Sequence, residues 1–135
     1  MRRVATVFGS LDFVYIPTAD VDTTARNYVE VLGAELVWKV RGLGTTVAAL
    51  RLSAEGPTLL LAGHLQGTTP VLVYRVDDYS AAVARLRGAG LEDLEELEIP
   101  HGPCASFVAP GGQRFAVYEL IRPGADDHFA GRVDP

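Results

Sequence analysis

The residues most often used for catalysis or metal binding are few and widely separated in this sequence. His64, His101 and His128 are the three histidines, spaced 37 and 27 positions apart. Zinc sites use ligands at short, characteristic spacings, and this spacing shows no such pattern. We therefore predict no metal site, and a metal site rebuilt from His64 and His101 is left as an alternative.

Cys104 is the single cysteine and follows the sequence His101-Gly102-Pro103. A histidine beside a cysteine can activate the thiol as a nucleophile. However, Gly102 and Pro103 predict a turn, and a lone cysteine usually packs as a small hydrophobic side chain. We therefore expect Cys104 to be buried, and we assign no catalytic residue. A single cysteine excludes an internal disulfide, so nothing indicates an oxidising compartment.

Acidic side chains are concentrated at positions 92–98, where five of seven residues are Asp or Glu. We interpret this run as the solvated face of a strand, where charge repulsion discourages pairing with other sheet edges. The alternative is a patch that attracts a basic ligand.

The composition narrows the class of protein. The chain has 135 residues, of which 48% are hydrophobic and 21% charged, and its net charge is −5. This length predicts one domain, and the apolar fraction is too high for a disordered chain. The negative charge argues against nucleic-acid binding, which depends on basic side chains. Apolar runs such as residues 59–62 are far shorter than the ~20 residues that cross a bilayer. We expect no membrane partner and a cytoplasmic location.

The pattern of the first half predicts a strand, a helix and three further strands. Residues 11–16 are rich in β-branched and aromatic side chains, as strands are. Asp20 or Asp22 can cap the helix, whose apolar residues recur every three to four positions, and Gly33 can end it. The later strands are expected at residues 36–40, 47–52 and 59–61.

The second half repeats this order. Residues 71–76 predict a strand, and Asp77 or Asp78 can cap the helix that follows. Gly88 or Gly90 can end that helix. The later strands are expected at residues 94–99, 105–109 and 115–120.

Equivalent residues of the two halves are separated by a nearly constant distance in the sequence. Phe13 and Val71 lie 58 positions apart, and Gly33 and Gly90 lie 57 positions apart. We therefore predict a duplicated βαβββ unit. The predicted modules span about residues 8–63 and 70–120, within one domain over residues 1–120. Residues 121–135 are predicted to be a C-terminal extension that Phe129 docks onto the domain.

Two such modules predict an α+β fold. One module alone would leave one face of its four-stranded sheet open. Two modules side by side give a curved, eight-stranded mixed sheet, a cup or half-barrel, with both helices outside. The concave face of such a sheet is a natural site for a small molecule. The sequence leaves open whether the modules pair within one chain or between two chains.

Three motifs together resemble the vicinal oxygen chelate superfamily. They are YIPTAD at residues 15–20, VDDYSAAVARLRGAG at residues 76–90 and APGGQRF at residues 109–115. The similarity covers residues 11–120. This superfamily includes glyoxalase I, bleomycin-resistance proteins, fosfomycin-resistance enzymes and extradiol dioxygenases, and the resemblance implies the cup-shaped fold described above.

The resemblance also implies where a metal would be bound. Enzymes of the superfamily hold a divalent metal with His, Gln or Glu side chains from four strands, and the metal stabilises negative charge on the substrate. The matching positions of this chain are all apolar: Phe13, Leu60, Val71 and Ala116. A shift of one residue would introduce only Asp12, which the strand period of two would turn out of the cup. We therefore expect no metal and no cofactor.

Without the metal, the chain resembles the bleomycin-type resistance proteins, which bind a drug without altering it in a cleft shared by two chains. The resemblance implies a homodimer with a small-molecule ligand, held by apolar and aromatic side chains of the concave face. The orientation of Trp38 and Phe107 is left open. The predicted ligand-binding residues are Phe13, Tyr15, Trp38, Leu60, Val71, Val73, Arg75, Phe107, Ala116 and Tyr118.

Each of these assignments has a plainer alternative. Phe13, Tyr15 and Tyr118 could simply be core residues. Arg75 could contact a ligand, form a salt bridge or turn outward, since an inward arginine needs a carboxylate, a ligand or water.

Four functions therefore compete. The first is a metal-independent protein that binds an apolar or aromatic small molecule. The second is a metal-dependent lyase, isomerase or dioxygenase with relocated ligands. The third is a metal-free enzyme that uses Arg75, Tyr15 or Tyr118, and the fourth is an interaction module with a filled cup. The first is the function that we predict.

Overall fold

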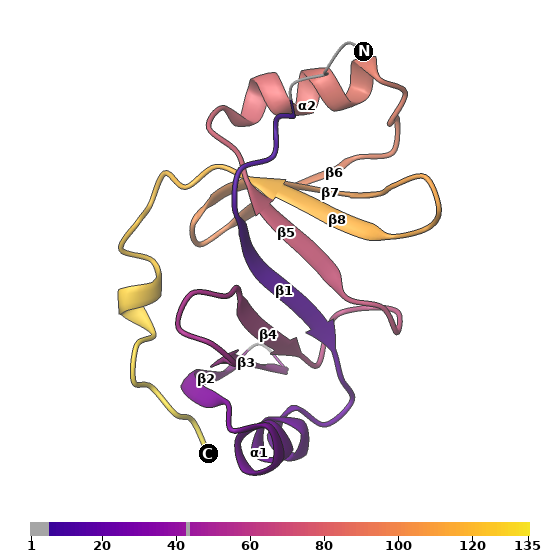
Figure 1. The fold of residues 1–135 in the computed structure, drawn as a ribbon. Helices are drawn as coiled ribbons and strands as arrows, with labels where there is room; N and C mark the ends of the chain where they lie inside the picture. Colours follow the sequence, from indigo (N-terminus) through magenta and orange to yellow (C-terminus); the bar gives the residue numbers. More distant parts are fainter. Residues whose placement is uncertain (1–5, 43) are drawn as a thin grey trace.

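The computed structural model of the protein describes residues 6–42 and 44–135. Its strands form one curved, mixed sheet of eight strands in the order β2-β3-β4-β1-β5-β8-β7-β6, and both helices lie outside it (Figure 1). The α+β fold class predicted from the sequence is therefore confirmed. Among the described residues, no helix is long and apolar enough to cross a membrane.

The first βαβββ unit occupies one half of the sheet. Its elements are β1 (Leu11–Pro17), α1 (Val21–Leu32), β2 (Glu35–Gly42), β3 (Thr45–Arg51) and β4 (Thr58–Ala62). Strand β1 pairs with β4 in parallel, while β2, β3 and β4 pair antiparallel in succession.

The second unit has the same order of elements. They are β5 (Val71–Arg75), α2 (Tyr79–Gly88), β6 (Glu95–Ile99), β7 (Gly102–Val108) and β8 (Arg114–Tyr118). Strand β5 pairs with β8 in parallel, as β1 pairs with β4. The two units join through the antiparallel pair β1 and β5, so the modules pair within one chain.

Each helix begins at a capping aspartate. Of the two candidates for α1, Asp20 is the cap, and its carboxylate accepts a hydrogen bond from the Thr23 N–H. Of the two candidates for α2, Asp78 is the cap and accepts from the Ala81 N–H. Gly33 ends α1 with φ of 71°, a left-handed conformation that glycine adopts without a steric penalty.

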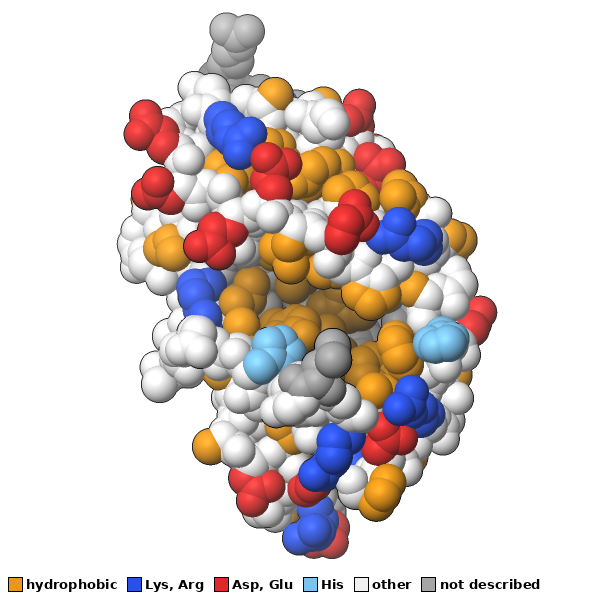
Figure 2. Space-filling model, turned by 180° about the vertical axis from the view of Figure 1, so that it is seen from behind, with side chains coloured by type: hydrophobic (Ala, Val, Ile, Leu, Met, Phe, Trp, Pro, Cys, Tyr) orange, Lys and Arg blue, Asp and Glu red, His pale blue; other side chains and the backbone are white. Residues whose placement is uncertain are grey.

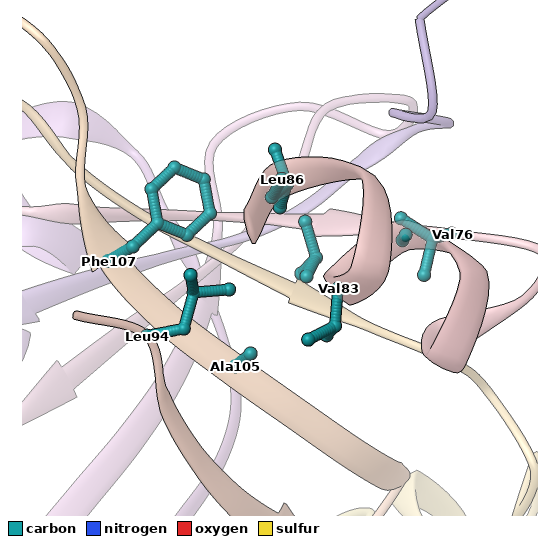
Figure 3. Packing of buried hydrophobic residues seen from close by; sticks show 8 residues of the cluster. Val76, Val83, Leu86, Leu94, Ala105 and Phe107 are labelled. Carbon is teal, nitrogen blue, oxygen red and sulfur yellow. The ribbon is translucent and has the colours of Figure 1, made fainter. Parts of the chain in front are cut away.

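The helices cover the outer face of the sheet, and each buries its own apolar cluster. Under α1 lie Val21, Ala25, Ala34, Ala48, Leu50 and Leu61. Under α2 lie Val76, Ala82, Val83, Leu86, Leu94, Ala105, Phe107 and Val117, most of them labelled in Figure 3. We call these two sets the outer clusters.

One predicted turn is wrong. Gly102 and Pro103 open strand β7 instead of forming a turn, and β7 starts three residues earlier than expected. A Cβ atom at Gly102 would lie 2.1 Å from the Glu119 carbonyl oxygen. Glycine therefore lets the two backbones approach closely here, which a local reading of Gly-Pro does not reveal.

The last residues return across the molecule. After β8 the chain forms a short 3₁₀ helix, Asp126–His128, and then runs beside β2, where Val133 bridges to Lys39 in parallel. In Figure 1 this segment runs along one side of the sheet. The Phe129 and Trp38 ring centroids are 5.3 Å apart, so Phe129 docks the extension as predicted.

We propose that the chain divides into a domain over residues 1–120 and an extension over residues 121–135. Residues 1–5 of that domain lie outside the described residues.

Candidate functional site

A third apolar cluster lies on the face of the sheet that no helix covers. Its buried members come from both halves of the sheet, and we call them the inner cluster. They are Phe13, Ala49, Leu60, Val73, Cys104, Ala116 and Tyr118. Seen from behind, the molecule has a central hollow in which hydrophobic side chains gather (Figure 2). The hollow is our candidate functional site.

The period of two along each strand explains this division into faces. On β4, Leu60 belongs to the inner cluster, while Leu61 lies under α1. On β8, Ala116 faces the inner cluster and Val117 lies under α2. Adjacent residues of one strand thus lie on opposite faces of the sheet.

The four positions that match metal ligands of related enzymes converge on this cluster. Phe13, Leu60 and Ala116 are buried members, and Val71 packs against them half-buried. The register brings them together, because Tyr15 of β1 lies opposite Leu60 on one side and opposite Val71 on the other. Aliphatic and phenyl side chains offer no lone pair to a metal, so these residues do not fit the metal of the related enzymes.

Most other predicted ligand-binding residues also lie here. Val73 and Tyr118 are buried members of the inner cluster, and Tyr15 and Trp38 pack against it half-buried. The structure therefore brings together eight of the ten predicted residues. These are Phe13, Tyr15, Trp38, Leu60, Val71, Val73, Ala116 and Tyr118.

The other two predicted residues lie elsewhere. Phe107 belongs to the outer cluster under α2, where its ring stacks on Phe115 with centroids 5.9 Å apart. Arg75 is exposed at the end of β5. There its backbone forms hydrogen bonds with Gly9 and Ser10, the two residues that precede β1. Arg75 therefore lies where the pairing of β1 with β5 ends.

Asp12 corrects a second expectation, because its carboxylate reaches an inner-cluster residue. The Tyr118 hydroxyl donates a hydrogen bond to the Asp12 carboxylate, and the Ser10 hydroxyl donates another at 2.6 Å. The pairing of β1 with β5 shifts register between Leu11 and Phe13. Such a bulge breaks the strict alternation of side chains, which is why the period of two misplaced Asp12.

Two histidines border the inner cluster, the same two that the sequence offered as an alternative metal site. The His101 ring lies 5.0 Å from the Phe13 ring and 5.9 Å from the Tyr118 ring, between centroids. The His64 ring lies 6.2 Å from the ring of Tyr15, and its Nδ1 is 3.0 Å from the Thr45 hydroxyl. Within residues 6–42 and 44–135, no three His, Cys, Asp or Glu side chains are grouped as a metal site requires.

Burial holds two titratable groups at the inner cluster, Cys104 and Tyr15, in their neutral forms. Burial raises the pKa of Cys104 to about 11, so the thiol stays protonated near neutral pH and is a poor nucleophile. Burial also raises the pKa of Tyr15, with a smaller contribution from Cys104. The site is therefore built to bury apolar surface and stack rings rather than to carry charge.

Comparison with known proteins supports the sequence resemblance. The family model of the Glyoxalase/Bleomycin resistance protein/Dioxygenase superfamily matches residues 10–116. No curated protein matches the sequence closely enough to count as a relative.

Solved structures of the same fold are numerous. A methylmalonyl-CoA epimerase from Mycobacterium tuberculosis superposes with a TM-score of 0.72 at 22% identity, covering 92% of this chain and 96% of the epimerase. A superfamily member from Vibrio splendidus gives 0.61 at 17% identity, covering 79% and 96%. A catechol 2,3-dioxygenase gives 0.63 at 15% identity, covering 85% of this chain and 42% of the dioxygenase. At these identities the likeness is one of fold.

Proposed function

This chain belongs to the glyoxalase/bleomycin resistance protein/dioxygenase superfamily, and from that premise we propose that it binds an apolar or aromatic small molecule in the hollow without a metal. The observation that carries the proposal is the chemistry of the inner cluster. The positions at which related enzymes would hold a metal carry Phe13, Leu60, Val71 and Ala116.

The hollow suits a ligand with an aromatic ring. Tyr15 and Trp38 lie half-buried against the inner cluster, and Phe13 and Tyr118 are its buried aromatic members; aromatic pairs add to the benefit of apolar burial. Burying ~200 Å² of apolar surface stabilises a complex by about 5 kcal/mol before the cost of association is subtracted. A stabilisation of about 5 kcal/mol corresponds to a dissociation constant of about 0.2 mM, so we expect simple aromatic probes to bind in the submillimolar to millimolar range.

The inner cluster also supports binding over proton-transfer chemistry. The Tyr118 hydroxyl is engaged with the Asp12 carboxylate, and Cys104 is protonated. A nucleophile or general base needs a pKa near the working pH, and burial moves the pKa of Tyr15 further above it. The epimerase and the dioxygenase named above share the fold with this chain, and a shared fold does not imply a shared reaction.

The state and location of the protein belong to the same proposal. We propose a homodimer, which the open edges of the sheet favour because unpaired edges need to be covered. A cytoplasmic location agrees with the single buried cysteine. The proposed ligand is a small molecule, with no nucleic acid and no membrane as partner.

Elemental analysis of protein purified without added metal tests the metal-independence. We expect less than stoichiometric zinc, iron, nickel and manganese. One equivalent of any of them would overturn the proposal in favour of a metal-dependent lyase, isomerase or dioxygenase with relocated ligands, among which His64 and His101 would be examined first.

A thermal-shift titration with the neutral fluorescent probe N-phenyl-1-naphthylamine tests the ligand site. A ligand that binds the folded state raises the melting temperature with its concentration. Val71→Phe, which fills the hollow, should abolish the shift. Leu72→Phe is the matched control, because Leu72 is the next residue of β5, is also half-buried and points to the other face of the sheet. Equal loss in both variants, or no shift in the unmodified chain, would contradict the proposal.

A further inference from the structure

The C-terminal extension connects the two outermost strands of the sheet. At its start, the Arg122 guanidinium donates to the carbonyl oxygens of Ile99 and Pro100 at 2.8 and 2.7 Å and pairs with Glu98, so it is anchored at the end of β6. At its end, Val133 bridges to Lys39 of β2. Because β2 and β6 are the opposite ends of the curved sheet, the extension connects one end of the sheet to the other, along the side of the sheet where Figure 1 shows it in yellow.

The far end of this segment lies against the wall of the hollow. Trp38 packs on the inner cluster, and the Phe129 ring lies on Trp38 with centroids 5.3 Å apart and planes inclined by 41°. The ring of His128 lies 5.1 Å from the Phe129 ring, between centroids, in an edge-on arrangement. The extension thus adds aromatic side chains to one side of the site.

A small number of hydrogen bonds to the edge strand β2 hold this end. The Lys39 N–H donates to the Arg132 carbonyl at 2.8 Å, and the Asp134 N–H donates to the Lys39 carbonyl at 2.9 Å. The Arg41 N–H donates to the Asp134 carboxylate at 2.8 Å. The strands around the hollow are instead held in ladders on both sides, except at the two edges. Segments with few buried contacts open at the lowest free energy.

The buried members of the inner cluster are at most 8% exposed, so a ligand that contacts them needs the half-buried side chains around them, Trp38 among them, to move. We propose that residues 129–134 form a releasable wall of the hollow, which detaches from β2 to let the ligand in and out. The inference rests on the proposed function, because it takes the hollow as the ligand site.

Trp38 makes the wall directly observable. It is the single tryptophan of the chain, so its fluorescence reports the docking of Phe129 with or without a ligand. Phe129→Ala removes the ring, and Gly131→Pro prevents docking by another route. Gly131 has φ of 76° and donates its N–H to the Val37 carbonyl, whereas proline has neither that conformation nor an N–H. Phe129→Leu keeps an apolar side chain and serves as the conservative variant.

The experiment compares these full-length variants with the unmodified chain and with Val108→Ala, which shortens an exposed side chain of β7. Circular dichroism and melting temperature check that each variant is folded. In Phe129→Ala and Gly131→Pro we expect Trp38 emission at longer wavelength and stronger quenching by acrylamide. Phe129→Leu should lie between these variants and the unmodified chain, and Val108→Ala should match the unmodified chain.

Stopped-flow mixing with N-phenyl-1-naphthylamine then measures the exchange of a ligand. We expect the association and dissociation rate constants to rise together by about tenfold in Phe129→Ala and Gly131→Pro, as a decrease of ~1.4 kcal/mol in the opening free energy would produce. The dissociation constant should change much less than the rates.

The possible failures are distinguishable. Unchanged Trp38 emission in both variants would overturn the docked wall whatever the probe does. Shifted emission with unchanged probe kinetics would overturn the gate while the proposed function stands. Absence of probe binding to every form, the unmodified chain included, would overturn the proposed function and the inference with it.

Discussion

The outer and inner faces of this sheet are made from the same strands but are completed in different ways. Leu61 and Val117 are fully buried under α1 and α2. Their chain neighbours Leu60 and Ala116 point to the opposite face, away from both helices. The difference shows that the helices complete the packing of the outer face, while the inner face has a hollow in which we propose that a ligand binds.

The comparison is strongest for Leu61 and Leu60, adjacent on β4 and identical in type. Leu61→Ala should lower the free energy of unfolding by about 3 kcal/mol or more, because a rigid cavity remains under α1. The loss for Leu60→Ala should be about 1 kcal/mol smaller, since the half-buried side chains around the inner cluster can relax into the space. Urea unfolding of both variants measures the two losses.

Probe binding by the same two variants sharpens the contrast. Leu60→Ala should weaken the binding of N-phenyl-1-naphthylamine, and Leu61→Ala should leave its dissociation constant unchanged at temperatures where the protein is folded. The reverse order, in stability or in binding, would mean that the two faces do not differ as described.

Tyr118 tests the polar part of the inner face. Its ring is 2% exposed, and its hydroxyl donates to Asp12. Tyr118→Phe should lower the free energy of unfolding by about 1–3 kcal/mol, as the loss of a hydrogen bond to a charged group does. Chemical denaturation provides the measurement.

The matched control comes from the outer face. Tyr28 packs half-buried beside the outer cluster under α1, and its hydroxyl has no hydrogen bond within the part of the chain that the structure describes. Tyr28→Phe should therefore be nearly neutral. Equal losses in the two variants would show that the bond to Asp12 contributes nothing.

The helix caps test whether the two helices on the outer face act independently of the hollow. Asp20→Ala and Asp78→Ala should each lower stability by about 1 kcal/mol, because backbone N–H groups at the helix start lose an acceptor. Thermal denaturation measures this loss. Probe binding should be unchanged in both folded variants, since neither cap borders the inner cluster, and a large change in affinity would break the proposed separation of the two faces.

The smallest expected effect is the response of the extension to acid. The Arg132 guanidinium and the Arg41 N–H lower the pKa of Asp134 to about 2. Because the pKa is depressed in the folded state, its contribution is present above the ordinary value of 3.8 and is lost as the pH falls through about 2. Trp38 fluorescence should therefore be constant from pH 7 to about 4 and change between about 4 and 2.

Asp134→Asn is the control for this titration, because its amide does not ionise in that range. It should abolish the pH-dependent step at Trp38, with far-UV circular dichroism recorded at each pH to exclude general unfolding. A step that persists unchanged in Asp134→Asn would assign the titration to another group.

Much of the architecture could be predicted because it depends on local patterns. The caps Asp20 and Asp78 and the terminator Gly33 act on neighbouring backbone groups, so local sequence is enough to propose them. The duplication predicted the eight strands, and the family resemblance implied that Phe13, Leu60, Val71 and Ala116 converge, as they do in the inner cluster.

The failures have long-range causes. Gly102 enters a strand because Glu119, 17 positions later, lies against its backbone. Asp12 reaches Tyr118 because a bulge in the pairing of β1 with β5 breaks the alternation. Phe107 shares the outer face with Ala105, two positions earlier on β7, while Cys104 faces the inner cluster; which face of β7 turns outward is set by its register with β8.

The sequence by itself determined the repeated unit and candidates for the helix ends, since these depend on residue type and spacing, and through the family resemblance it implied that the metal-ligand positions are apolar. Only the tertiary structure decided that His64 and His101 border the hollow and that the extension crosses to β2. Those contacts join residues far apart in the chain, and their partners are selected by the curvature and register of the whole sheet.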